Sequence, residues 1–130
     1  MAWTVFEYLY RDADNHKAFG KVAFEGEVSG LDWDFALSNF EGGLYFIAEQ
    51  IGLPALYSQL LRWSGNAPTD ADHCWHEFVS ITNSDAATLD SDIPRTGSAK
   101  DFIERIAAIE NWNILLSPIV EHQRRNSPSW

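Results

Sequence analysis

Residues 3–11 read WTVFEYLYR and residues 19–28 read FGKVAFEGEV, and these two stretches decide the fold. The first is rich in the aromatic and β-branched residues that strands favour. In the second, Val22, Phe24 and Val28 alternate with charged residues, which is the two-residue period of a strand with one buried face. The short segment between them is polar, as turns are, so we predict a β-hairpin.

Helix signals follow the hairpin. Ser29 and Ser98 each stand three residues before an aspartate, a variant of the N-terminal capping box. A third helix is expected to open at Gly52-Leu53-Pro54, with Leu56, Leu60 and Trp63 on one face. The predicted helices are 29–40, the segment that opens at 52–54, 98–109 and a short one around 115–120.

Two further strands are predicted at 44–51 and 73–82. In the second, Trp75, Val79 and Ile81 are expected on one face, and Cys74, His76, Phe78 and Ser80 on the other. Residues 83–97 are predicted to be a polar, acidic loop.

These elements together indicate an α+β fold. The order β-β-α-β-α-β-α-α favours a mostly antiparallel sheet of about four strands with helices packed on one face. No repeat or linker divides the chain, so we predict a single domain over residues 1–122 and a frayed C-terminal tail at 123–130.

The charge of the chain is strongly negative and unevenly distributed. Nineteen acidic residues against nine basic ones give a net charge of −10. Between Val22 and Pro94 the only basic residue is Arg62. Such a field repels nucleic acid and anionic membranes and attracts basic proteins, so we expect neither nucleic acid nor a membrane to be bound directly. General solubility is the alternative reason for an acidic composition.

The cellular location and the need for a cofactor are predicted from sequence features that are absent. Cys74 is its only cysteine, so no internal disulfide forms, which favours a reducing environment. The N-terminus has no basic segment and no apolar run approaches membrane-spanning length, so a cytoplasmic location is predicted. No nucleotide or phosphate-loop motif occurs, and no cofactor is expected.

The first polar cluster is YRDADNHK at residues 10–17. Arg11 and Lys17 are suited to hold a phosphate or carboxylate, with Asp12 orienting the guanidinium and Tyr10 and Asn15 beside them. The alternative is a charged hairpin turn that faces water.

The second polar cluster is DADHCWHE at residues 70–77. His73, Cys74 and His76 are metal-ligand types, but a strand places Cys74 and His76 on the face opposite His73. A Cys74 nucleophile with His76 as its base is a further alternative, although neighbouring strand positions seldom align for proton transfer.

A third polar pair, Glu49-Gln50, follows an apolar run and is suited to line a cleft. The three segments together define an alternative in which a small molecule binds, with or without catalysis. The residues expected to converge in that pocket are Tyr10, Arg11, Asp12, Asn15, Lys17, Glu49, Gln50, His73 and His76.

The three segments YRDADNHK at 10–17, FIAEQIGLP at 46–54 and DHCWHE at 72–77 carry a resemblance. Together they resemble a family of small uncharacterised bacterial proteins, over roughly residues 3 to 105. Ala48 stands where that family's pattern has proline. The resemblance brings no activity with it, and it implies that the three segments belong to one site.

The leading hypothesis is an acidic binding protein that blocks a basic partner. Immunity proteins of toxin systems and inhibitors of nucleic-acid-handling defence complexes are examples of this type. Opposite potentials speed association, and aromatic side chains supply binding energy. No motif fixes a reaction, so binding is favoured over catalysis. The predicted contact residues are Asp70, Asp72, Glu77, Asp85, Asp90 and Asp92, with Trp63 and Trp75.

Overall fold

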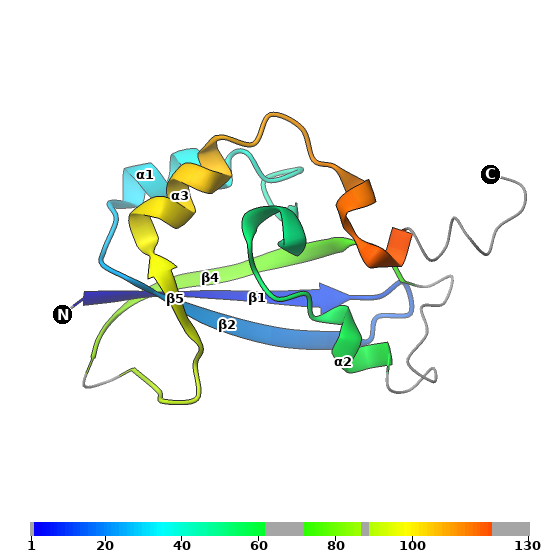
Figure 1. Ribbon diagram of the computed structural model, residues 1–130, viewed down its shortest axis with the longest axis horizontal. Coiled ribbons are helices and arrows are strands. Elements are labelled where there is room, and N and C mark those ends of the chain that lie inside the picture. Colours follow the sequence, from blue (N-terminus) through cyan, green and yellow to red (C-terminus); the bar gives the residue numbers. More distant parts are fainter. Residues whose placement is uncertain (1, 62–71, 87–88, 121–130) are drawn as a thin grey trace, which may run out of the picture.

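The computed structural model describes residues 2–61, 72–86 and 89–120. Its strands form one five-stranded sheet in the order β3-β4-β1-β2-β5 (Figure 1). The strands are β1 (Ala2–Arg11), β2 (Lys17–Glu25), β3 (Tyr45–Ile47), β4 (Trp75–Asp85) and β5 (Arg95–Ser98). Over the described residues the helices are α1 (Gly30–Leu37), α2 (Tyr57–Leu61) and α3 (Ala99–Ala107), with the 3-10 turns η1 (Ala48–Ile51) and η3 (Ile114–Leu116).

The predicted α+β class is confirmed, but the sheet differs from the expectation. It has five strands rather than four, and it is mixed, because β5 runs parallel to β2. The fifth strand begins inside the predicted loop 83–97 and ends one residue beyond it, at Ser98. Its four residues carry no apolar side chain larger than glycine and are mostly exposed, so no alternation of apolar residues marks it in the sequence.

The hairpin of β1 and β2 is confirmed. The strands pair antiparallel in an unbroken register that sets Phe6 opposite Val22. Asp12 holds the turn, since its Oδ1 accepts the N–H groups of Asp14 (3.0 Å) and His16 (2.9 Å). β2 ends earlier than predicted because Gly26 has a φ of 95°, a conformation that breaks the extended backbone.

Both predicted caps are present. The Oγ of Ser29 accepts the N–H of Asp32 at 3.2 Å, and that of Ser98 accepts the N–H of Asp101 at 3.1 Å. Each bond satisfies an N–H that has no partner inside its helix. The caps thereby fix where α1 and α3 begin.

The predicted strand 44–51 is wrong beyond Ile47. There the chain turns into η1, which ends at Gly52 with a φ of 76°. α2 begins at Tyr57 rather than near Pro54, and Trp63 lies outside the described residues. The short helix expected around 115–120 is present as η3 and a helical turn at 118–120, and the predicted tail at 123–130 also lies outside the described residues.

A bulge in β4 changes which residues face the core. Phe78 lies opposite Tyr8, but Phe6 lies opposite Ile81, so the register skips one residue between the two pairs. Phe78 and Ile81 therefore both pack against the main core. The prediction that they point to opposite faces is wrong, because strict alternation holds only up to the bulge.

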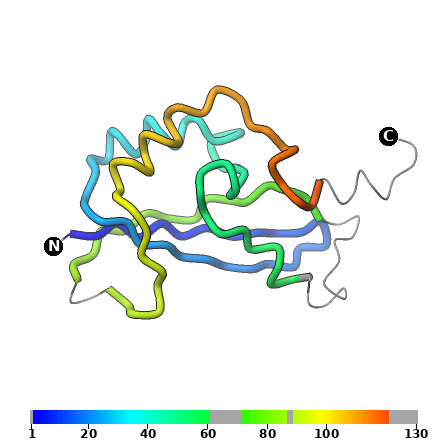
Figure 2. Tube along the Cα trace, in the orientation of Figure 1, coloured from blue at the N-terminus to red at the C-terminus, as the bar shows by residue number. Residues whose placement is uncertain are grey.

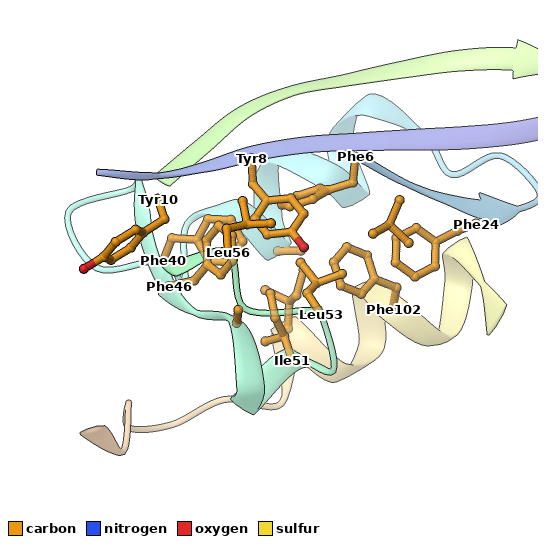
Figure 3. Packing of buried hydrophobic residues seen from close by; sticks show 14 of the residues in the cluster. Phe6, Tyr8, Tyr10, Phe24, Phe40, Phe46, Ile51, Leu53, Leu56 and Phe102 are labelled. Atoms are coloured by element: carbon orange, nitrogen blue, oxygen red, sulfur yellow. The ribbon is translucent and has the colours of Figure 1, made fainter. Parts of the chain in front are cut away.

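The main core lies between one face of the sheet and the helices (Figure 3). Phe6 is at its centre, fully buried, with ring centroids 5.2 Å from Phe102 and 5.4 Å from Phe78. A smaller cluster of Val5, Ala23 and Leu89 occupies the opposite face. Figure 2 shows the segment before β5 running on that side, away from α1 and α3.

Candidate functional site

Tyr10 joins the first two polar clusters. Its hydroxyl donates to Asp72 Oδ1 at 2.7 Å and accepts the N–H of His73 at 3.1 Å. Burial, followed by the bond to Asp72, raises the pKa of Tyr10 far above its usual value. Tyr10 is thus a neutral core residue that anchors the segment leading into β4.

The two histidines of the second cluster bind backbone groups. His73 Nδ1 accepts the N–H of Trp75 at 3.0 Å, so its Nε2 carries the proton and donates to Arg11 O at 2.6 Å. His76 Nε2 accepts the N–H of Leu56 at 2.9 Å, and its Nδ1 lies 3.3 Å from Cys74 O. Both imidazoles therefore hold chain segments together.

The metal and nucleophile alternatives find no geometry to support them. In the described part of the chain no group of three His, Cys, Asp or Glu side chains converges as metal ligands do. Burial raises the pKa of the Cys74 thiol to about 11 and lowers the pKa of His76 to about 4. A neutral thiol beside a weak, engaged imidazole does not form the thiolate that nucleophilic attack requires.

The thiol of Cys74 is expected to resist alkylation in the folded protein. Raising its pKa from 9.0 to about 11 lowers the thiolate population about 100-fold at neutral pH, and burial also blocks access. Iodoacetamide labelling, followed by mass spectrometry, compares the native chain with the same chain in urea. Equal rates in the two states would restore Cys74 as a reactive group.

The first cluster forms a structured turn. Arg11 Nε donates to Glu77 Oε2 at 3.0 Å, and its Nη1 donates to Asn15 Oδ1 at 2.7 Å. Slight burial alone would raise the pKa of Asp12, but its hydrogen bonds from His16 and Asp14 lower it overall. Of the cations expected to grip an anion here, Lys17 is exposed and Arg11 is already paired.

The third polar pair is also engaged. Glu49 Oε2 accepts the hydroxyl of Tyr57 at 2.5 Å, and the Tyr57 ring contacts that of Tyr10 at 5.8 Å. Gln50 Nε2 donates to Asn111 O at 2.9 Å, while its Oε1 accepts the N–H of Asn113. The structure thus places the three segments side by side, joined by internal contacts.

The predicted acidic contact residues divide into three groups. Asp70 and Trp63 lie outside the described residues. Asp72, Glu77 and Trp75 have internal partners, the last an edge-on contact with Trp112 at 6.2 Å. The exposed members are Asp85, Asp90 and Asp92, at and after the end of β4.

Of the large apolar side chains in the described residues, the two most exposed lie on α1, where none had been predicted to bind. Leu31 and Phe35 are 82% and 70% exposed, although Trp33 and Ala36 on the same helix are buried. Leu31 and Phe35 are one turn apart and share a face, with Asp32 and Asp34 on its flanks. We call these four residues the α1 outer face.

A signal for this face is present in the sequence. The segment GLDWDFAL has apolar residues on both sides of a helix rather than along one stripe. A short surface helix normally reserves its outer side for polar residues. A helical-wheel reading of residues 30–37 would have located the outer face.

Comparisons with family models, with curated proteins and with solved structures gave no match to this chain. Among the described helices, none is long and apolar enough to cross a membrane.

Proposed function

We propose that this protein is an acidic binding protein that blocks a basic protein partner through the α1 outer face. The observation that carries the proposal is the pair of exposed apolar side chains, Leu31 and Phe35, flanked by Asp32 and Asp34. A helix that is apolar on both sides is normally covered on both sides. α1 has α3 and the sheet on its inner side (Figure 1), and its outer side faces solvent.

The apolar part of this face supplies binding energy. Burying a leucine or phenylalanine side chain is worth about 1.5 to 3 kcal/mol. Aromatic side chains at the centre of an interface, ringed by polar groups, are the usual hot spots. Phe35 occupies such a position, because charged residues lie on both sides of it.

The carboxylates give the face its preference for a cation. The ion pairs among the described residues join Arg11 to Glu77, His16 to Asp12, and Lys21 to Glu7. None of these pairs involves α1, so no cation of the described residues neutralises Asp32 or Asp34. This protein has a net charge of −10, and its field attracts a basic partner over a long range.

Proteins that handle nucleic acids are a class of partner with this chemistry. Nuclease toxins and nucleic-acid-handling defence complexes present basic surfaces to phosphates. An acidic protein that covers such a surface competes with the nucleic acid. The proposed role is therefore that of an immunity protein or of an inhibitor of such a complex.

We expect Phe35→Ser to weaken partner binding at least about tenfold. The partner is first captured on immobilised wild-type protein from the native host at low salt, and its affinity for purified variants is then measured. Phe19→Ser is the matched control, because Phe19 is 60% exposed on β2 and lies outside the α1 outer face. Equal loss in both variants, or none in either, would contradict the assignment of the face.

The contribution of the carboxylates on the α1 outer face can be measured separately, through the rate of association. Asp32→Asn with Asp34→Asn should slow association and flatten its salt dependence, while exchanging the exposed Asp14 for asparagine should do neither. Association rates at about 50 and 300 mM salt test this. An association rate that does not respond to salt in the wild type would remove the charge argument.

A further inference from the structure

The outer edge of β2 is only partly paired. The N–H of Ala23 donates to Pro94 O at 2.8 Å, on the side away from β1. In an antiparallel pair, residues two apart direct their backbone groups to the same side. The N–H and C=O groups of Lys21 and Phe19 therefore also point away from β1.

These groups have no backbone partner among the described residues. β5 pairs with β2 only from Ala23 onward, and the register with β1 is regular along the rest of β2. An unpaired strand edge is a template on which another strand can form. The ammonium of Lys21, which could guard the edge, is instead held by Glu7 at 3.3 Å across the hairpin.

A groove lies along this edge. It has a volume of about 380 Å³, and Lys21, Gly20 and Val22 of β2 form one side. The other lining residues are Tyr8, Pro54, Leu56 and Gln59, and Asp92, Ile93 and Pro94 just before β5.

Gly20 determines how closely the groove wall approaches the strand. A Cβ at this position would lie 2.8 Å from Leu56 Cδ2 and 3.2 Å from the Tyr8 ring. The absence of a side chain lets Leu56 pack directly against the core face of β2, beside the outer edge. The groove thus sets an apolar wall beside the outward backbone groups of Lys21, and those of Phe19 follow on the same edge just outside its lining.

We propose that this groove binds an extended peptide segment of a partner protein as an additional strand beside β2. The backbone donors and acceptors of Lys21, inside the groove, and of Phe19, two residues along the same edge, have the spacing of an extended chain. An apolar side chain of the peptide packs against Leu56 and Pro54. A basic side chain near the end of the segment faces Asp92. The site is independent of the α1 outer face.

The test uses a displayed library of random nonapeptides, selected on the intact protein. We expect selected peptides to protect the amide protons of Phe19 and Lys21 from exchange at least about tenfold, as measured by NMR. The same peptides with alternate backbone nitrogens methylated should not bind, because they lack the required donors. A selection that yields no peptide protecting these two amides would overturn the proposal.

A pair of variants separates backbone from side chain. Lys21→Pro removes the outward N–H and is compatible with an edge position, whereas Lys21→Thr keeps the N–H and loses only the contact with Glu7. Lys21→Pro should lower the affinity of the protein for the selected peptides at least about tenfold more than Lys21→Thr does. Equal affinities would overturn the proposal, and the exchange measurement on wild-type protein decides it if the proline variant does not fold. Phe35→Ser should bind the peptides normally, which separates this site from the α1 outer face.

Discussion

Replacing Phe6 with alanine is expected to lower the free energy of unfolding by about 3 to 5 kcal/mol. Phe6 is fully buried, and its ring lies within contact distance of the rings of Tyr8, Phe40, Phe46, Phe78 and Phe102. Truncation removes the apolar transfer energy of the ring and leaves a cavity between the sheet and α3. The rigid rings around the cavity limit how far the core can collapse into it.

Urea unfolding followed by tryptophan fluorescence measures this change. Phe19→Ala is the control on the neighbouring strand, because its side chain is largely exposed and should cost under about 1 kcal/mol. Total domain stabilities are about 5 to 15 kcal/mol, so this loss is between about a fifth and all of the stability of the wild type. A loss of under about 1 kcal/mol would mean that the core does not centre on Phe6.

The sequence predicts those parts of the fold that local patterns encode. The hairpin follows from the aromatic and β-branched residues of β1 and the alternation in β2, and the two helix caps follow from Ser29 and Ser98. The bulge in β4 and the parallel strand β5 are set by pairing with distant residues. No local pattern marks such pairing, so neither could be predicted.

The candidate site shows the same division. Polar clusters such as residues 70–77 suggest chemistry, but His73 and His76 are used to satisfy backbone groups of buried segments. The residue types are visible in the sequence, but the hydrogen-bond partners of their side chains are not. By contrast, the α1 outer face depends only on spacing along one helix, so its pattern was present in residues 30–37.

His76 is expected to make the protein lose stability as pH falls from 6.5 toward 4. Burial lowers its folded-state pKa to about 4 from a usual value of 6.5. Between these values the unfolded chain takes up a proton that the folded chain does not, so acid favours unfolding. The stabilisation is complete above about pH 6.5 and is lost through pH 4. In total it amounts to about 3 kcal/mol, of which about 2 kcal/mol is lost by pH 5.

The imidazole of His76 cannot take up this proton in the folded protein without losing a hydrogen bond. Its Nε2 is engaged by the N–H of Leu56, and the rings of Tyr8, Tyr10 and Tyr57 enclose it. His76→Gln retains an oxygen that can accept the Leu56 N–H but does not titrate. Urea unfolding at pH 7 and pH 5 should therefore show a stability loss about 2 kcal/mol smaller in the variant than in the wild type. Carboxylates that titrate in this range do so in both proteins, so the difference between the two losses isolates His76. Identical losses would mean that this histidine is protonated in the folded state and that the packing around Leu56 opens in acid.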